Sequence, residues 1–276
     1  MEAVSRLEHL TALDRAVGPL QRLARLVPAP LRDPLHGVWL GHPVHPLLVQ
    51  VPIGSWLSAT ALGFTAGNER AARQLTTLGL VSAAPAAVTG AVDWAEQHEQ
   101  QLRVGVVHAA SNWVAIACFT GSLAGRSARR AQVLRLCGLA AVGVSGALGG
   151  HLSFRLAGGV NHAEAVPHLI TPGWHALLPE QDLTDGVPVR CMIGEVPVLA
   201  IRYGGRVRVL ADRCSHMSGP LSEGEISDGA VTCPWHGSRF CLTDGTVVAG
   251  PATAPQPSFE TRVRDGVIQV RLPDAG

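Results

Sequence analysis

Two short pairs of cysteine and histidine determine the character of the C-terminal half: Cys214-Ser-His216 and Cys233-Pro-Trp-His236-Gly-Ser238. Sixteen residues separate the two pairs. Thiolates and neutral imidazoles are ligands of zinc and iron. The pattern therefore predicts a metal centre held by Cys214, His216, Cys233 and His236. Because each pair is short and has its own loop, the two loops are expected to grip one small centre from opposite sides.

Zinc is the nearest alternative, because Cys and His also form tetrahedral structural zinc sites. The usual pairing of two Cys separated by two residues is absent, and each arm supplies one Cys and one His instead. Two thiolates on one iron and two imidazoles on its neighbour define a Rieske [2Fe–2S] centre. The local sequences CSHMSGPL and CPWHGSRF closely resemble those of Rieske ferredoxins, over roughly residues 181–272.

The resemblance extends to the residues around the cluster. It implies that Trp235, Ser238 and Pro251 contact the cofactor, with Pro251 in a proline-containing loop that covers the third side of the cluster; an ordinary surface turn is the alternative for that loop. High-potential Rieske subunits carry a disulfide between the two loops, and Gly219 and Trp235 stand at the corresponding places. Phe240 occupies the place of a Tyr whose hydroxyl bonds to the cluster. Fewer hydrogen bonds to sulfur lower the potential, so we expect a value low in the Rieske range of about −150 to +300 mV.

The sequence around these loops is typical of a small antiparallel β domain. From about residue 181, short stretches with alternating apolar residues are separated by Gly and Asp turns. The expected strands are VPVRCMI, VPVLAIRY, RVRVLAD, AVTCP, SFETRVRDG and VIQVRL. Residues 161–180, rich in Gly and Pro, are expected to be a linker, and residues 181–273 to be the β domain.

The preceding sequence is typical of a membrane protein. The chain of 276 residues is 47% hydrophobic and only 16% charged, against about a quarter charged in soluble proteins. Four apolar stretches of roughly 20 residues, rich in small residues, run over about 46–66, 74–94, 104–124 and 133–153. That length crosses a bilayer as a helix, and small residues let membrane helices pack closely. A four-helix transmembrane bundle over residues 41–160 is the prediction; a buried soluble bundle is the alternative.

Residues 1–40 carry leucines at helical spacing with Arg between them, which predicts an amphipathic segment. It could lie on the membrane surface or pack against the rest of the chain. The segment 38–162 resembles an uncharacterised four-helix bacterial membrane family with an HPxHP motif at its start, here His42-Pro-Val-His45-Pro, and a Gly-Gly motif at its end. The resemblance implies no settled activity.

A second redox site in the bundle is suggested by polar residues near the ends of the spans. With four spans, His45, Asp93, His108 and His151 fall near one membrane face, and ionisable groups in spans are often functional. The hypothesis is haem b or a quinone bound there. The alternative is that these side chains only form hydrogen bonds at helix ends.

These features predict a multi-pass cell-membrane protein that transfers one electron at a time between a reductase or other donor and a membrane or partner acceptor. Candidate partners are a reductase, an oxygenase or an oxidase; the net charge of +1 gives no indication of nucleic acid. A cluster-based redox sensor and a subunit of a larger oxidoreductase complex are the alternatives. A complete Rieske oxygenase is disfavoured, because residues 237–276 contain no His for a mononuclear iron. The arginines in the loops favour a β domain outside the cell. Assembly of the cluster without a twin-Arg signal favours a β domain on the cytoplasmic face. We expect the cytoplasmic face.

Overall fold

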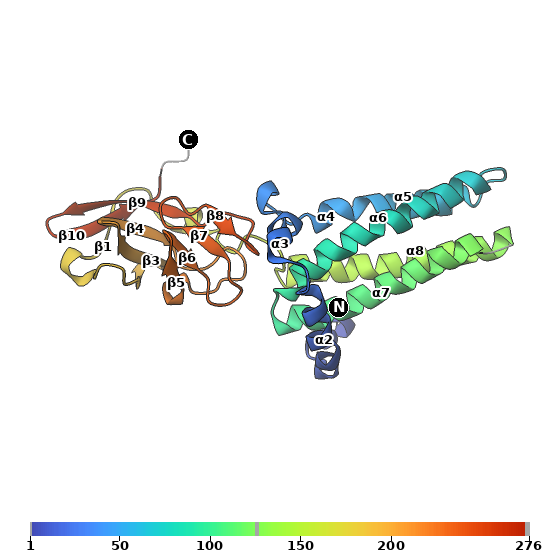
Figure 1. Ribbon diagram of the computed structural model, residues 1–276, viewed down its shortest axis with the longest axis horizontal. Helices are drawn as coiled ribbons and strands as arrows, with labels where there is room; N and C mark the ends of the chain where they lie inside the picture. Colours follow the sequence, from blue (N-terminus) through green and yellow to red (C-terminus); the bar gives the residue numbers. More distant parts are fainter. Residues whose placement is uncertain (1, 125–126, 274–276) are drawn as a thin grey trace. The chain divides into compact units, whose positions relative to one another are not determined.

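The computed structural model describes residues 2–124 and 127–273, which divide into two compact units (Figure 1). The helical unit comprises residues 1–28 and 44–158, and the β unit comprises residues 29–43 and 159–276. A helical region followed by a β domain confirms the predicted architecture. The division of the chain is less simple than the sequence suggested, since residues 29–43 belong with the β unit.

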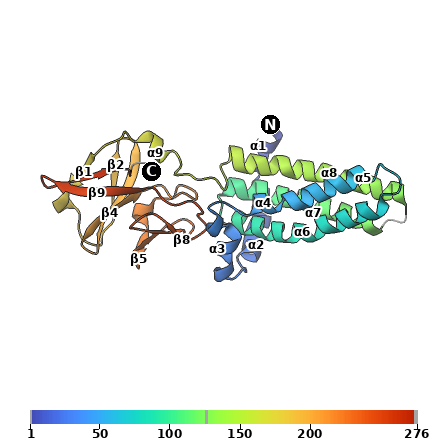
Figure 2. The same cartoon turned by 90° about the horizontal axis from the view of Figure 1, so that it is seen from above.

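The helical unit is built on long helices that run side by side (Figures 1 and 2). Their bounds are α4 His45–Leu48, α5 Gln50–Leu62, α6 Glu69–Ala95, α7 Glu99–Ala124 and α8 Ala128–Gly150. A π-helical turn over His151–Arg155 extends α8. Among the described residues, three helices are long and apolar enough to cross a membrane: Glu69–Ala95, Glu99–Ala124 and Ala128–Arg155.

The first predicted span is shorter than the other three. It consists of α4 and α5, which are separated at Val49. Pro52 lies two residues inside α5 and has no N–H to donate to the carbonyl of the preceding turn, so the helical hydrogen bonds are interrupted there. The bundle therefore has the expected order of four helical segments, but the first is about 20 Å long in its unbroken part.

Small residues on α6 and α8 accommodate an aromatic pair at the centre of the bundle. The rings of Trp56 and Phe119 stack with centroids 4.5 Å apart and planes 8° from parallel. A Cβ on Gly79 would collide with the Trp56 ring, and one on Gly138 would lie 2.8 Å from the Phe119 ring. Close helix approach through small residues is how membrane helices gain packing energy without a hydrophobic driving force.

The outer surface of the bundle is apolar. Only 33%, 33% and 28% of the most apolar windows of the three long helices is buried, so most of their apolar side chains face outward. Large exposed examples are Leu57, Val81, Trp113 and Val144. A surface of this kind suits lipid better than water.

The N-terminal amphipathic segment is not one helix. It forms α1 Glu2–Glu8, α2 Asp14–Ala24 and α3 Ala29–His36. The first two pack on the bundle through Arg103 of α7, which donates to both Asp14 carboxylate oxygens at 2.7 and 2.9 Å and to the Glu8 carbonyl at 3.0 Å. These contacts favour the alternative in which the segment packs on the protein.

The β unit contains two antiparallel sheets. One has six strands in the order β1-β10-β9-β4-β3-β2, and the other has four in the order β5-β6-β7-β8. The strands are β1 His175–Pro179, β2 Val189–Ile193, β3 Val196–Tyr203, β4 Arg206–Ala211, β5 Glu225–Ser227, β6 Ala230–Thr232, β7 Arg239–Cys241, β8 Val247–Ala249, β9 Ser258–Arg264 and β10 Val267–Arg271. A short helix, α9 Val166–Leu169, precedes them.

The six predicted strands are confirmed as β2, β3, β4, β6, β9 and β10. Strand β1 lies in the predicted linker, where His175 pairs with Val270 of β10. Two apolar cores fill the unit, one on the six-stranded sheet around Val198 and Ile268, and one around Phe240 and Leu242 that also contains both Cys214 and Cys233. The predicted metal-ligating thiols are therefore part of a hydrophobic core.

Candidate metal centre

Two loops with matching hydrogen bonds carry the four predicted ligands. The first ligand loop, residues 214–219, follows β4, and the second, residues 233–238, joins β6 to β7. In the first, Cys214 N donates to Gly219 O at 2.9 Å and Ser218 N donates to Cys214 O at 2.8 Å. In the second, Cys233 N donates to Ser238 O at 2.8 Å and Gly237 N donates to Cys233 O at 3.1 Å. Each six-residue loop thus presents its Cys and His in a similar way.

The fifth residue of each loop adopts a left-handed backbone conformation. It is Gly237, with φ of 77°, in the second loop and Ser218, with φ of 63°, in the first. A non-glycine residue there costs about 1 kcal/mol or more. The Ser218 hydroxyl lies 3.2 Å from His162 Nδ1, and His162 N donates to Ser215 O at 2.9 Å. The segment before β1 therefore supports the strained loop.

The loops bring the ligands together in two pairs, Cys214 with Cys233 and His216 with His236. Cys214 and Cys233 are 1% and 3% exposed, whereas His216 and His236 are partly exposed, with ring centroids 5.1 Å apart and planes at 87°. The hydrogen bond from the Cys214 thiol, helped by backbone N–H groups of the second loop, lowers the pKa of Cys233 to about 6 despite burial. The same thiol pair, with burial, raises the pKa of Cys214. The two sulfurs are therefore adjacent, and a thiolate is favoured at Cys233.

This arrangement fits a Rieske cluster. Two adjacent thiols lie in the core and two imidazoles lie at the protein surface, which matches two thiolates on one iron and two imidazoles on the other. Backbone N–H groups of His216 and Met217 point at the Cys214 sulfur. Within residues 2–124 and 127–273, no three His, Cys, Asp or Glu side chains are grouped as a mononuclear site would need.

A third loop, residues 250–256, is tied to both ligand loops. Ala252 N donates to Ser238 Oγ at 3.0 Å, and Ser215 Oγ donates to Ala254 O at 2.7 Å. Pro251 is buried within this loop. On the other side, Gly250 N donates to Asp33 Oδ1 of α3 at 2.9 Å. The structure thus brings Ser238 and Pro251 together next to the ligand loops, while the roles of Ser238, Trp235 and Pro251 toward the cofactor stay predictions.

Gln256 was missed by the sequence reasoning. Its side chain is 1% exposed; Nε2 donates to Ala211 O at 2.7 Å and Arg213 O at 2.6 Å, and Oε1 accepts from Ser215 N at 3.0 Å. Gln256 therefore fixes the third loop to the strand end and to the loop that carries Cys214. Only its flanking prolines mark it in the sequence, and they do not reveal these contacts.

Replacing Gln256 with Leu should destabilise the β unit by about 3 kcal/mol. The change leaves one buried N–H and two carbonyls without these partners, and unmet buried groups cost about 1–3 kcal/mol each. Chemical denaturation of the full chain, followed by the visible absorbance of the cluster, measures the effect. The matched control is Gln269→Leu, which removes only an exposed hydrogen bond from Arg262. Equal stability of the two variants would contradict the assignment.

Gly219 is required by its surroundings. A Cβ at this position would lie 2.7 Å from Cys233 Sγ and 3.1 Å from the Trp235 ring. Any side chain at position 219 would therefore require the second ligand loop to move away. All six cysteines are free thiols, and Trp235, at the other disulfide position of high-potential relatives, is 50% exposed.

The residues of the predicted second site separate into different environments. His45 and His108 come together, with ring centroids 6.5 Å apart. His151 instead contacts Glu8, with Nε2 2.8 Å from Oε1. Asp93 lies near the end of α6, where its carbonyl accepts from Glu96 N. The four residues do not all lie in one cluster that could hold a metal ion.

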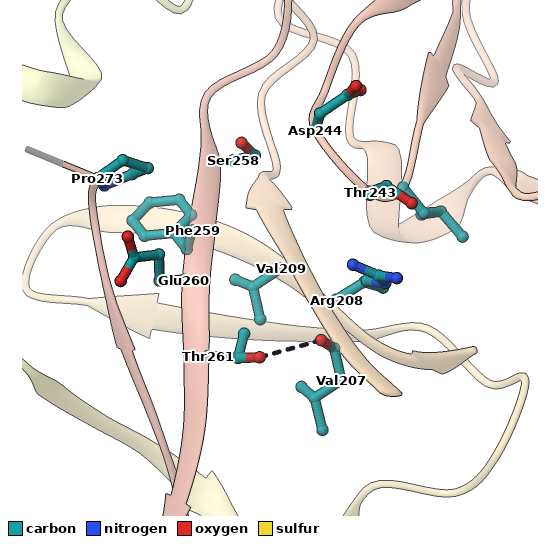
Figure 3. A pocket seen from close by; sticks show the side chains of 11 residues that line it. Val207, Arg208, Val209, Thr243, Asp244, Ser258, Phe259, Glu260, Thr261 and Pro273 are labelled. Atoms are coloured by element: carbon teal, nitrogen blue, oxygen red, sulfur yellow. Dashed lines mark hydrogen bonds between the residues drawn. The ribbon is translucent and has the colours of Figure 1, made fainter. Parts of the chain in front are cut away.

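A pocket of about 300 Å³ lies elsewhere on the β unit, between β4, β9 and the turn after β7 (Figure 3). Val207, Arg208, Asp244 and Glu260 are among its lining residues, and Thr261 Oγ1 donates across it to Val207 O at 3.1 Å. None of the four ligand residues lines it. The pocket is therefore separate from the metal centre.

Comparison with known proteins agrees with this geometry. Residues 173–260 match the model of the Rieske [2Fe–2S] domain, and residues 41–162 match that of a predicted membrane protein family (DUF2231). The chain is 38% identical over 99 residues to the 3-phenylpropionate/cinnamic acid dioxygenase ferredoxin subunit of Escherichia coli (strain K12), covering 35% of this chain and 92% of that protein. It is 31% identical to the anthranilate 1,2-dioxygenase ferredoxin subunit of Burkholderia cepacia, covering 36% and 92%.

Solved structures are similar to part of this chain. The ferredoxin of carbazole 1,9a-dioxygenase from Nocardioides aromaticivorans IC177 is 24% identical and covers 36% of this chain and 98% of its own, with a TM-score of 0.35. The predicted HPxHP motif of the membrane segment stays a prediction. Because a relative 38% identical is matched over 92% of its length and residues 173–260 match the domain model, the chain belongs to the Rieske [2Fe–2S] family through residues 173–260 and carries a DUF2231 membrane-protein domain at residues 41–162.

Proposed function

We propose that the chain is a membrane-anchored Rieske ferredoxin that passes single electrons from a reductase to a partner or membrane acceptor. The observation that carries the proposal is the ligand arrangement: two buried thiols behind two partly exposed histidines. The Rieske domain is homologous to ferredoxin subunits of dioxygenase systems. Electrons would enter and leave at the histidine edge, where a partner can approach.

The bound cluster supplies the redox chemistry, and the protein supplies binding and electrostatics. Cys214 and Cys233, in the core, would hold one iron, and the partly exposed His216 and His236 would hold the other. The hydroxyl of Ser238 accepts from Ala252 N, which leaves its own proton available to a cluster sulfur. No side chain needs to act as a general acid or base in this function.

The direct test is reduction of the purified full chain. Dithionite should produce the EPR signal of a reduced Rieske cluster, and an NADH-dependent ferredoxin reductase should produce the same signal within its turnover time. A chain that dithionite reduces but that exchanges no electrons with any reductase or acceptor protein would favour the redox-sensor alternative. A chain without iron and acid-labile sulfide would contradict the whole proposal.

Trp235 is expected to be a docking residue for the redox partner. It is 50% exposed and next to His236, and exposed Trp residues often dominate transient interfaces. Trp235→Ser should lower the second-order rate of electron exchange about tenfold, equivalent to a loss of about 1.4 kcal/mol. Stopped-flow absorbance measures that rate. Val248→Ser, at a site that is 49% exposed on β8, is the control, and an equal effect in both variants would contradict the assignment.

We further propose that the helical unit anchors the protein in the cell membrane with the Rieske domain on the cytoplasmic face. The DUF2231 match, the three apolar helices and the outward-facing apolar side chains support the anchor. Cluster assembly in the cytosol and access to soluble reductases support the side. Protease added to right-side-out vesicles should leave the domain intact, and digestion there would place it outside.

A further inference from the structure

The helical unit contains two histidines in equivalent settings. His45 Nδ1 lies 2.8 Å from Ala86 O of α6, and His108 Nδ1 lies 2.9 Å from Ser145 O of α8. His45 is the first residue of α4 in the α4/α5–α6 hairpin, and His108 lies in α7 of the α7–α8 hairpin. In each hairpin, a histidine of the first helical segment bonds to a carbonyl of the second.

The equivalence includes a glycine four residues after each carbonyl. Gly90 follows Ala86, and Gly149 follows Ser145. A Cβ on Gly90 would lie 2.8 Å from His45 Cε1, and one on Gly149 would lie 3.4 Å from His108 Cε1. The lack of a side chain at Gly90 therefore leaves room for the His45 ring, which bonds to the Ala86 carbonyl one turn earlier. Gly149 allows the His108 ring to approach α8 in the same way. Two helical hairpins that repeat one arrangement often form a binding site between them.

The hydrogen bonds fix the protonation of both rings. A carbonyl oxygen only accepts, so the carbonyl contacts place the proton on Nδ1 in each histidine. The Ser145 hydroxyl also lies 3.0 Å from His108 Nδ1, and it donates to the His108 carbonyl at 3.4 Å, so its oxygen can accept from the same N–H. In the neutral ring the lone pair is then on Nε2, and for His108 this agrees with Asn112 Nδ2 at 3.2 Å from Nε2. Nδ1–H bonded to a carbonyl with Nε2 available is the usual form of a metal-ligating histidine. A quinone needs donors for its oxygens, which these Nε2 atoms do not provide.

The spacing suits two imidazoles on one metal. A metal–nitrogen bond is about 2 Å long, so two nitrogens on opposite sides of an ion are about 4 Å apart and the ring centres about 6 Å apart. The centroids of His45 and His108 are 6.5 Å apart, with planes at 76°. Across residues 2–124 and 127–273, no third His, Cys, Asp or Glu joins such a group. Haem iron needs only two protein ligands, because the porphyrin supplies four.

We propose that His45 and His108 bind the iron of one haem through Nε2, between the two helical hairpins. Bundles bind cofactors in this way, through side chains of facing helices. Asn112 would release Nε2 of His108 when the iron binds. His151 takes no part, because it contacts Glu8.

The test uses the full chain, purified in mild detergent and titrated with haemin. Optical and EPR spectra should show a six-coordinate, low-spin haem at about one per chain. In His45→Ala and in His108→Ala, haem retention should fall at least tenfold. Mutation of residues that only support a metal ligand already lowers metal affinity by about 10–100-fold. In His45→Met the haem should remain but show His–Met ligation and a higher potential, a change that a merely structural histidine would not cause.

The control is His42→Ala, because His42 is exposed and its Nδ1 lies 3.0 Å from the carbonyl of the adjacent Pro43. This variant should keep wild-type spectra. Absence of a low-spin signal after haemin titration would overturn the inference. So would unchanged spectra in both alanine variants, which would show adventitious haem only. The Rieske EPR signal is recorded in the same samples, so failure of the cluster is distinguished from failure of the haem site.

Discussion

Replacing His236 with Ala should abolish the Rieske EPR signal. In the proposed site the imidazole would supply one of two protein ligands to its iron. Its neighbours in the second loop, Trp235 and Gly237, offer no substitute ligand. Because cluster binding contributes to folding free energy, the β unit should also lose stability. EPR of the reduced protein and iron and sulfide analysis measure the loss of the cluster, and thermal unfolding measures the stability.

The control for this substitution is His168→Ala. His168 lies in α9 of the same unit and is largely exposed, with Nε2 3.6 Å from Glu164. This variant should keep its full cluster content and signal. A wild-type EPR signal in His236→Ala would show that the iron is held by other residues and would remove the basis of the assignment.

Substitutions at Ser238 and Phe240 should move the reduction potential in opposite directions. Ser238→Ala removes the hydroxyl that is proposed to donate to a cluster sulfur, so the reduced cluster would lose a hydrogen bond and the potential should fall. A bond worth about 1.4 kcal/mol to the reduced form corresponds to about 60 mV for one electron. The variant should also lose about 1–3 kcal/mol of stability, because Ala252 N, in a residue 1% exposed, loses its acceptor.

Phe240→Tyr should raise the potential by about the same 60 mV, because the added hydroxyl restores the donor found in high-potential relatives. Phe240 is 0% exposed in the core that contains both ligand cysteines. Phe259→Tyr is the control: Phe259 lies in the other core, on β9, and its variant should leave the potential unchanged. Redox titration of the three variants decides the question, and equal shifts in both Tyr variants would contradict the specific role of Phe240.

The sequence was most informative where the chemistry demands particular residues. The four ligands could be predicted because thiolates and imidazoles in this spacing have few other uses. Five of the six predicted strands could be recognised because their alternating apolar residues extend over five or more residues, whereas the sixth, β6, has only three. Strands β5, β7 and β8 have three residues each, too few to show alternation. Strand β1 was hidden in a Pro- and Gly-rich stretch, because its pairing with β10 depends on residues almost 100 positions away.

Other features depend on contacts that no local pattern reveals. The sequence suggested four comparable spans, but Pro52 interrupts the first. It grouped His45, His108 and His151, whereas the structure brings only His45 and His108 together. His151 instead contacts Glu8 of the N-terminal segment. Gln256 connects the third loop with the end of β4, with Arg213 and with the first ligand loop through three hydrogen bonds. Its position between two prolines does not indicate these contacts. Side-chain pairing over long sequence separations explains these differences.

We propose that these loops hold a Rieske cluster that carries one electron at a time, which can be examined by EPR-monitored redox titration of membranes containing the full chain. We expect a reduced-cluster signal that follows a one-electron Nernst curve, with a midpoint in the lower part of the range of about −150 to +300 mV. A midpoint near the top of that range would contradict the predicted cluster environment, and the absence of any signal in protein that contains zinc would contradict the cluster itself.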